Sequence, residues 1–218
     1  MVNTIQGPHQ NQTVVATGAS IENAPVAMVM VHGRGATAEN ILTLAFELQQ
    51  PDIAYLAPQA AGSTWYPYSF LAPIERNEPG LSSGLAVIAT ILEQVAAAGI
   101  PPERTILLGF SQGACLSLEF AARNAKKYGA VIGLSGGLIG PEGIPRDYPG
   151  SLDGTPVFLG CSDIDPHIPL TRVQESTEIL RGLGGNVTER IYPGMAHTIN
   201  QDEIDFVQQV VQSLVPSS

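Results

Sequence analysis

Runs of consecutive apolar residues alternate along this chain with segments whose apolar residues recur every three or four positions. The first pattern is typical of strands that are buried on both faces, and the second of amphipathic helices. Val26–Val31 is an unbroken apolar run, and in the segment after it Ile41, Leu44 and Leu48 fall on one helical face. This alternation predicts an α/β domain with a mainly parallel central sheet flanked by helices.

Turn residues and capping signals set the expected boundaries. The expected strands are 26–31, 53–57, 105–108, 130–134, 155–160 and 188–192. The expected helices are one that starts after Thr37, and 81–98, 112–124, 169–180 and 201–214. Thr37 is the expected N-cap of the first, with Asn40 at its third position, and Pro169 is expected at the first helical position of 169–180. Residues 62–80 and 135–154 are expected to be irregular. No linker separates two cores, so we expect a single domain over residues 1–218, with residues 1–23 as an N-terminal extension or edge strand.

Composition and charge exclude several classes of function. Charged residues make up 14% of the 218 positions, the net charge is −10, and only Lys126 and Lys127 are lysines. A basic patch for nucleic acid or anionic lipid is therefore not expected. The longest unbroken apolar run has about six residues, well below the ~20 of a membrane helix, and the N-terminus lacks the features of a signal peptide. Two cysteines do not make a disulfide framework, which favours a reducing, cytoplasmic location.

The segment 109–113 reads Gly-Phe-Ser-Gln-Gly and matches the pattern G-x-S-x-G. It lies between an expected strand and an expected helix, which is the setting of a nucleophile elbow. In such an elbow, a sharp turn presents the serine, here Ser111, and the flanking glycines avoid steric clashes. The alternative interpretation is a glycine-rich turn that carries an incidental serine.

A nucleophilic serine requires a base and an acid that orients the base. Of the four histidines, His197 follows a strand near the C-terminus and fits the order serine, acid, histidine. His9 lies in a polar segment and is expected to be solvated. Two aspartates compete for the role of the acid. Asp165 is favoured by its spacing from the helix at Pro169, and Asp163 is the alternative acid; the other of the two would stabilise the loop.

Four of the chain's aromatic residues lie between positions 65 and 70. This clustering after a strand predicts one wall of an apolar pocket, with Trp65 and Tyr66 as the substrate-binding residues. The alternative is a satellite hydrophobic cluster under a long loop. Cys115 is expected to be a small core residue. We expect no metal site, because Cys161, Asp163, Asp165 and His167 alternate along an extended segment and would point in opposing directions.

Together, four motifs resemble those of a known family. They are His-Gly-Arg-Gly at 32–35, Gly-Phe-Ser-Gln-Gly-Ala at 109–114, Asp-Pro-His-Ile-Pro at 165–169 and Tyr-Pro-Gly-Met-Ala-His at 192–197. The chain resembles the phospholipase/carboxylesterase family of α/β-hydrolases, which includes bacterial carboxylesterases and acyl-protein thioesterases. The resemblance implies an α/β-hydrolase fold without a large cap domain. It also implies an oxyanion hole made of the backbone N–H groups of Arg34 and Gln112. The guanidinium of Arg34 would then either hold an anionic substrate group or be a solvated loop charge.

The function that follows from this resemblance is that of a serine carboxylesterase. Ser111, Asp165 and His197 would hydrolyse a small carboxylic ester or thioester through an acyl-enzyme, without a cofactor. The alternatives are a lysophospholipase, an acyl-protein thioesterase, or a catalytically silent binding module with this fold. Ala36 and Ala196 replace residues that are frequent in the family, so the resemblance does not name the substrate. The chain is expected to be a monomer or a homodimer.

Overall fold

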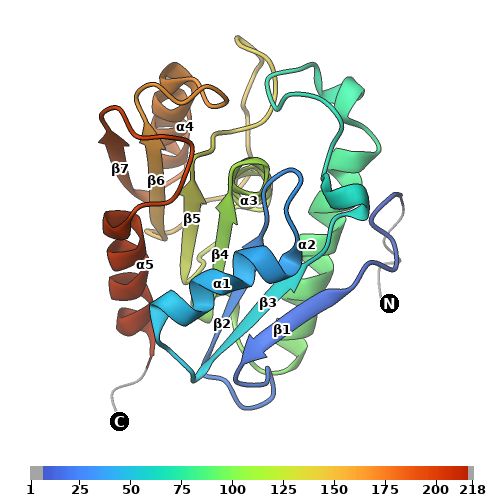
Figure 1. Cartoon of the computed structure of the whole chain (residues 1–218), viewed down its shortest axis with the longest axis vertical. Coiled ribbons are helices and arrows are strands. Elements are labelled where there is room, and N and C mark those ends of the chain that lie inside the picture. The colour runs from blue at the N-terminus through green and yellow to red at the C-terminus, as the bar shows by residue number, and fades with distance from the viewer. Residues whose placement is uncertain (1–6, 216–218) are drawn as a thin grey trace.

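The computed structural model describes residues 7–215, and they contain a seven-stranded sheet with the order β1-β3-β2-β4-β5-β6-β7 (Figure 1). Strand β1 pairs antiparallel with β3, and all other neighbours are parallel. The expected fold class is therefore confirmed. The strands are β1 (Val14–Gly18), β2 (Val26–Val31), β3 (Ile53–Pro58), β4 (Thr105–Phe110), β5 (Ala130–Leu134), β6 (Pro156–Ser162) and β7 (Asn186–Tyr192).

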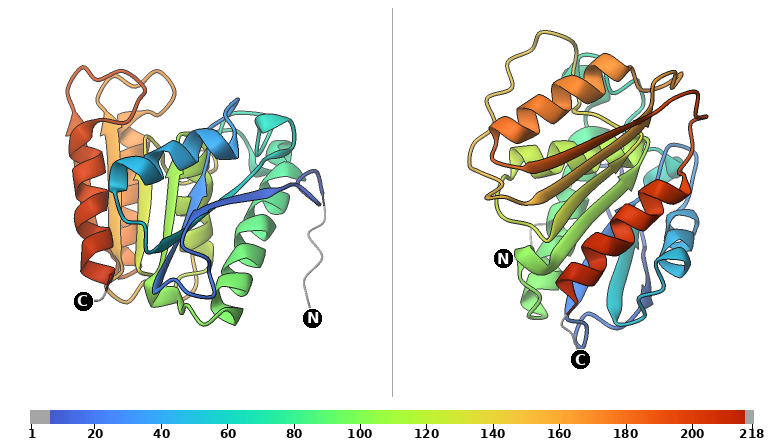
Figure 2. Two further views of the ribbon diagram at one scale, coloured as in Figure 1. Left: turned by 60° about the horizontal axis from the view of Figure 1, so that its bottom comes forward. Right: turned by 90° about the vertical axis from the view of Figure 1, so that its left-hand side faces the viewer.

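Among the described residues, five α-helices cover the two faces of the sheet (Figure 2). They are α1 (Ala38–Leu48), α2 (Gly80–Ala97), α3 (Gln112–Arg123), α4 (Leu170–Gly182) and α5 (Gln201–Leu214). Helices α1 and α5 pack on one face, and α2, α3 and α4 pack on the other. No large cap covers the carboxyl edge of the strands in the described part of the chain.

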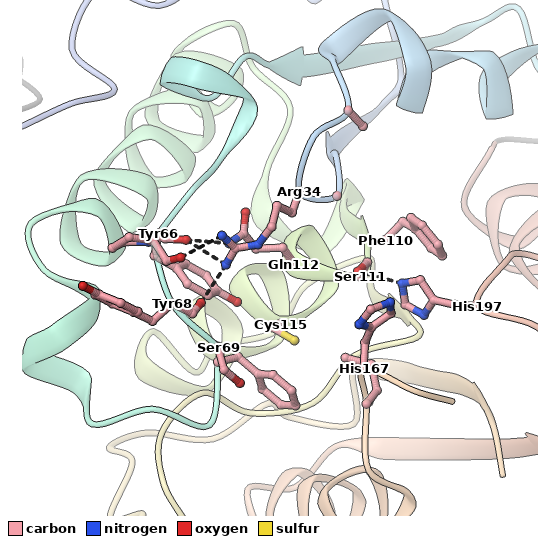
Figure 3. Close-up of a pocket in the computed structure, with 15 residues that line it drawn as sticks. Arg34, Tyr66, Tyr68, Ser69, Phe110, Ser111, Gln112, Cys115, His167 and His197 are labelled. Carbon is pink, nitrogen blue, oxygen red and sulfur yellow. Dashed lines mark hydrogen bonds between the residues drawn. The ribbon is translucent and has the colours of Figure 1, made fainter. Parts of the chain in front are cut away.

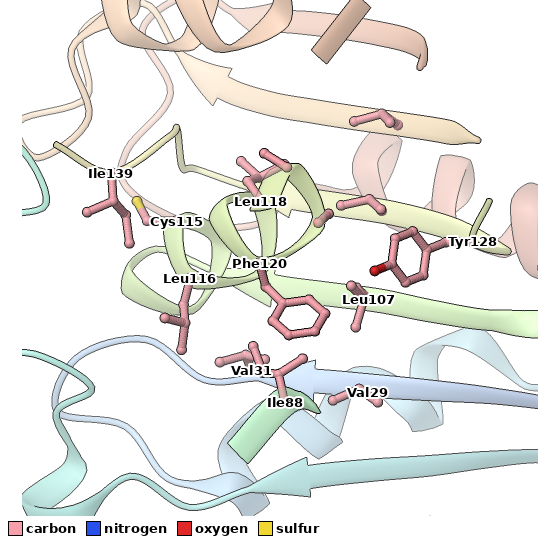
Figure 4. Close-up of a cluster of buried hydrophobic side chains, with 14 of the residues drawn as sticks. Val29, Val31, Ile88, Leu107, Cys115, Leu116, Leu118, Phe120, Tyr128 and Ile139 are labelled. Carbon is pink, nitrogen blue, oxygen red and sulfur yellow. The ribbon is translucent and has the colours of Figure 1, made fainter. Parts of the chain in front are cut away.

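The core has one layer on each side of the sheet because side chains along a strand alternate between its faces. In β2, Ala27, Val29 and Val31 belong to the layer under α2, α3 and α4, and the alternate residues of β2 belong to the layer under α1 and α5. All six residues of β2 are inaccessible to solvent, as expected for a central parallel strand. Figure 4 shows the first layer around α3, where Leu116 and Phe120 meet Val31 and Ile88.

Local capping signals position α1 as expected. Thr37 is the N-cap, its side chain accepts from the Asn40 N–H, and the Asn40 side chain accepts from the Thr37 N–H. The prediction for α4 is wrong by one residue. Pro169 has φ −60° and ψ 132°, which is extended, and its carbonyl accepts the N–H groups of Arg172 and Val173, so it is the N-cap.

Two features of the N-terminal half differ from expectation or go beyond it. Residues 1–6 of the expected N-terminal extension lie outside the described range, and residues 14–18 form the edge strand β1.

His9 is buried, so the prediction of a solvated side chain is wrong. Its Nε2 is 2.9 Å from the carbonyl oxygen of Trp65, and its Nδ1 accepts from the Ala61 N–H. These long-range bonds satisfy both ring nitrogens and so allow the imidazole to be buried.

Helix α2 is the one helix among residues 7–215 that is long and apolar enough to cross a membrane by length and composition. Half of it is buried inside the structure. Leu81, Ile88 and Val95 lie in the hydrophobic layer between α2, α3 and the sheet, so in this structure the helix forms part of the core.

Candidate active site

The loops that carry the motif residues meet at the carboxyl edge of the parallel strands. The 32–35 loop follows β2, Ser111 follows β4, the 163–169 loop follows β6, and the 193–200 loop follows β7. In open α/β sheets, ligands bind at this edge. The sheet order therefore brings four segments that are far apart in sequence to one place.

Ser111 lies in a sharp turn between β4 and α3, with φ 55° and ψ −118°. A positive φ is strained for a residue that has a side chain, and such strain is typical of functional sites. The flanking glycines are required sterically. A Cβ atom at Gly109 would collide with the carbonyl of Gly113, and a Cβ atom at Gly113 would collide with the carbonyl of Val31. The turn is thus packed against β2 and has the geometry of a nucleophile elbow.

A continuous series of hydrogen bonds links Ser111, His197 and Asp165. His197 Nε2 is 2.8 Å from Ser111 Oγ, and His197 Nδ1 is 2.6 Å from Asp165 Oδ2 (Figure 3 shows the first of these contacts). The second oxygen of Asp165 accepts the N–H groups of His167 (2.8 Å) and Ile168 (3.1 Å). The Asp165 side chain is fully covered, whereas 18% of the His197 side chain is exposed. The carboxylate is therefore held rigidly while the imidazole faces the cavity.

Opposing effects act on the pKa of Asp165. Burial alone would raise its pKa, but the hydrogen bonds from His197, His167 and Ile168 outweigh it, so the pKa lies below the usual value. The carboxylate is therefore ionised at neutral pH. The Cys161 thiol, 3.8 Å from Asp165 Oδ2, also faces this oxygen. Burial, followed by the charge of Asp165, raises the pKa of Cys161 to about 12, so the thiol stays protonated.

Asp163 occupies a different position from Asp165. It is exposed, and its Oδ1 accepts the Gly194 N–H at 2.8 Å. This bond joins the loop after β6 to the loop that carries His197. The structure thus brings Asp165 to the histidine, and it places Asp163 in a contact between loops.

The backbone N–H groups of Arg34 and Gln112 are the expected oxyanion donors. Gln112 is the first residue of α3, so its N–H belongs to a helix N-terminus, where backbone donors lack intrahelical partners. Both residues line the same cavity as Ser111. Among residues 7–215, neither N–H has a hydrogen-bond acceptor in the protein. Both groups are available to an oxygen bound beside Ser111.

The Arg34 side chain is exposed at the edge of the cavity, and its guanidinium is also held by the protein, a contact that neither expectation included. It donates hydrogen bonds to the carbonyl oxygens of Tyr66, Pro67 and Tyr68. Sequence reasoning missed these contacts because they join residues more than 30 positions apart and leave no local signal.

The site opens into a cavity of about 460 Å³. Apolar and aromatic groups line most of it, and Figure 3 shows Tyr66 and Tyr68 on one side and His167 and His197 on the other. The lining residues are Gly33, Arg34, Ala36, Tyr66, Pro67, Tyr68, Ser69, Phe70, Phe110, Ser111, Gln112, Cys115, His167, Ile168 and His197. A cavity of this size and character suits a small ligand.

Of the two predicted substrate-binding residues, Tyr66 lines the cavity and Trp65 does not. Trp65 is fully buried in the core, and its Nε1 donates to the carbonyl oxygen of His32 at 2.9 Å. The prediction for Trp65 is therefore wrong. Its indole faces away from the cavity because a buried N–H needs an acceptor, which the end of β2 supplies.

Sequence reasoning missed two lining residues that contact the histidine. The rings of His167 and Phe110 lie 4.9 Å and 5.1 Å from the ring of His197. Phe110 is next to Ser111 in the elbow, and His167 follows Asp165 by two positions, so spacing from the motif residues is the signal that could have found them. Cys115 is buried as expected and also lines the cavity. Within residues 7–215, no group of three or more His, Cys, Asp or Glu side chains is arranged to hold a metal ion.

Comparisons with known proteins give a consistent result. The family model described as phospholipase/carboxylesterase matches residues 10–215. A solved phospholipase/carboxylesterase from Dyadobacter fermentans is 43% identical, with a TM-score of 0.90, and the alignment covers 95% of this chain and 99% of that one. The structure of esterase PE8 is 25% identical, with a TM-score of 0.76, and covers 94% and 99%.

Curated relatives carry the name acyl-protein thioesterase 1. The protein from Saccharomyces cerevisiae is 29% identical over 225 residues, covering 91% of this chain and 97% of the relative. The protein from Gibberella zeae is 34% identical over 146 residues, and this match spans 65% of this chain and 62% of that relative. On the match over residues 10–215, the chain belongs to the phospholipase/carboxylesterase family, a family of serine hydrolases that act on ester bonds.

Proposed function

We propose that this chain is a serine carboxylesterase that hydrolyses carboxylic esters and thioesters through Ser111, His197 and Asp165 and an acyl-enzyme intermediate. The observation that carries the proposal is the hydrogen-bonded series from Asp165 through His197 to Ser111 at the wall of an open cavity. This series supports the assignment of Ser111 as the nucleophile, His197 as the base and Asp165 as the orienting acid of an acyl transfer.

Acylation begins when His197 Nε2 takes the proton of the Ser111 hydroxyl as its oxygen attacks the substrate carbonyl carbon. The carbonyl oxygen becomes negatively charged and accepts hydrogen bonds from the N–H groups of Arg34 and Gln112. Asp165 remains ionised and stabilises the imidazolium. His197 then donates its proton to the leaving alcohol or thiol, the bond between the carbonyl carbon and that group breaks, and the acyl group stays on Ser111.

Deacylation repeats these steps with water. His197 takes a proton from water, and the resulting nucleophile attacks the acyl carbon on Ser111. The bond to Ser111 Oγ breaks, the serine regains its proton from His197, and the carboxylic acid leaves. Every proton is moved by His197, so the proposed reaction needs no cofactor.

An acyl-protein thioesterase is the second candidate, because the relative that spans nearly the whole chain carries that name. A lysophospholipid is a further candidate substrate, because the family description also includes phospholipases. A chain-length series of p-nitrophenyl esters, with an acyl-peptide thioester and a lysophospholipid alongside, separates these functions by kcat/KM. We expect the simple esters to have the highest values. A thioester that exceeds all of them would assign the chain to the thioesterases instead.

Substitution of the nucleophile tests the proposal as a whole. Ser111→Ala removes the attacking oxygen and should abolish turnover of every ester while the thermal unfolding curve stays cooperative. A fluorophosphonate probe should label the wild type and not the variant. Folded wild-type protein that neither turns over esters nor reacts with the probe would instead be the silent binding module.

The state of the cysteines supports a cytoplasmic location for the enzyme. Cys115 and Cys161 are both free and buried. Burial raises the pKa of each thiol to about 12, so neither is a reactive thiolate at neutral pH. Such cysteines suit a reducing compartment, where no disulfide is needed.

A further inference from the structure

The two residues proposed to supply the oxyanion N–H groups both direct their side chains to the same short segment, residues 65–68. Arg34 Nη1 donates to the Pro67 carbonyl (2.8 Å), and Arg34 Nη2 donates to the carbonyls of Tyr66 (3.0 Å) and Tyr68 (2.6 Å). Gln112 Oε1 accepts the Trp65 N–H (2.8 Å), and Gln112 Nε2 donates to the Tyr66 carbonyl (2.9 Å). Five hydrogen bonds therefore tie four consecutive residues to the oxyanion site, and Figure 3 shows the Arg34 contacts.

Residues 66–68, here called the tyrosine wall, form one side of the cavity. They belong to neither a helix nor a strand, so no regular backbone ladder holds them. Trp65 before the wall is fixed in the core by its indole N–H, and Asn77 accepts the Tyr68 N–H at 3.0 Å. The carbonyl oxygens of the wall, in contrast, are held by side chains of the oxyanion site.

Arg34 acts here as a fork of hydrogen-bond donors and not as half of an ion pair. Within residues 7–215, no carboxylate lies within 4 Å of its guanidinium. A guanidinium can bind several carbonyl oxygens at once because its donors lie in a fixed plane, and a lysine ammonium cannot reproduce this geometry.

The backbone around Arg34 has separate supports. The Gly35 N–H donates to the Ser63 carbonyl at 2.7 Å, and the Ala36 N–H donates to the Gly33 carbonyl at 3.2 Å. Removal of the Arg34 side chain therefore takes away three hydrogen bonds of the tyrosine wall and leaves those from Gln112 and Asn77, while the backbone N–H of residue 34 keeps its place. The two roles of this residue can be separated by substitution.

We propose that the side chain of Arg34 is a positioning residue that fixes the tyrosine wall relative to the oxyanion site, and that it thereby selects esters whose acyl group is long or aromatic enough to contact the wall. An acyl group that rests on Tyr66 and Tyr68 is then aligned with the N–H groups of Arg34 and Gln112. A short acyl group that does not reach the wall gains nothing from it. This inference rests on the proposed esterase function.

Arg34→Met keeps the length of the side chain and removes its donors. The test measures KM and kcat of the full chain with p-nitrophenyl acetate and p-nitrophenyl hexanoate. We expect KM for the hexanoate to rise about tenfold, because three hydrogen bonds to the wall are lost, and we expect the ratio of hexanoate to acetate kcat/KM to fall by about the same factor. Arg34→Lys should restore part of the hexanoate affinity, since its ammonium can reach only some of the carbonyls.

Arg76→Met is the matched control, because it removes an equal charge beside the wall. The Arg76 guanidinium lies 4.2 Å from the centre of the Tyr68 ring and does not bind the wall carbonyls. It should change the ratio of hexanoate to acetate activity much less than Arg34→Met does, because it leaves all five hydrogen bonds to residues 65–68 in place. An equal effect of both variants would show that charge matters and not positioning, and would overturn the inference.

Two other results would also overturn it. One is an unchanged hexanoate KM in a folded Arg34→Met protein, and the other is a loss of kcat that is as large for the acetate as for the hexanoate. Failure of the proposed function looks different, because the wild type itself would then hydrolyse neither ester.

Discussion

Asp165→Asn changes one atom of the site, and the hydrogen bonds around it determine the outcome. In the wild type, Oδ1 accepts two backbone N–H groups and Oδ2 faces His197 Nδ1. An asparagine must keep its oxygen toward the two N–H groups, because its NH₂ group cannot accept from them. Its NH₂ group is then forced toward His197 Nδ1.

The consequence is an inverted histidine tautomer. With a donor facing Nδ1, this nitrogen must accept, so the ring proton moves to Nε2, which lies 2.8 Å from Ser111 Oγ. A protonated Nε2 cannot take the serine proton. In serine proteases with the same arrangement, this substitution lowers kcat about 10⁴-fold, which corresponds to roughly 5 kcal/mol of transition-state stabilisation. Burial of the Asp165 side chain keeps water from replacing the lost acceptor, so we expect a loss of similar size.

The assay is steady-state hydrolysis of p-nitrophenyl acetate, with thermal unfolding as a check that the variants fold. Asp163→Asn is the matched control, because an asparagine oxygen can still accept the Gly194 N–H. It should retain kcat within about threefold of the wild type. Retention of more than a tenth of the wild-type kcat by Asp165→Asn would refute this reasoning. A larger loss in Asp163→Asn would move the role of the acid to that residue.

Two further predictions concern stability. Glu203 is buried, and burial raises its pKa to about 7, above the value of about 4.3 in the unfolded chain. The protonated carboxyl therefore favours the folded state, and this contribution is complete at low pH and is lost as the pH rises through 7. Glu203→Gln should therefore raise the melting temperature by about 5 °C or more at pH 8 and change it little at pH 5, and an equal shift at both pH values would contradict this. Gly113→Ala forces a Cβ atom onto the Val31 carbonyl and should cost about 3 kcal/mol or more in denaturant unfolding. Gly35→Ala, with φ 77° and open space around it, should cost only about 1 kcal/mol, so equal costs would contradict the steric argument.

Local patterns account for the parts of the fold that could be predicted. The apolar run of β2 and the capping box of α1 are encoded within a few residues, and both were found where the sequence placed them. The error at Pro169 has a local origin as well, since proline suits both the cap and the first helical position. Its spacing from Asp165 still indicated which aspartate the structure brings to His197.

The wrong predictions concern side chains whose partners lie far away in the sequence. The residue type and the neighbouring sequence predict a pocket wall for Trp65 and solvent exposure for His9. Their burial depends on contacts with each other and with His32, across 56 and 33 positions. The contacts of Arg34 with the tyrosine wall depend in the same way on how the loops after β2 and β3 meet. Periodicity and motifs carry no information about such pairs.

The central claim is that Ser111 forms a covalent acyl-enzyme, and mass spectrometry of the acid-quenched reaction tests it most directly. During turnover of p-nitrophenyl hexanoate, a fraction of the intact protein should gain the mass of one hexanoyl group. Peptide mapping should place this group on Ser111, and it should be absent from Ser111→Ala. An acyl group on another residue, or full turnover by Ser111→Ala, would contradict the account.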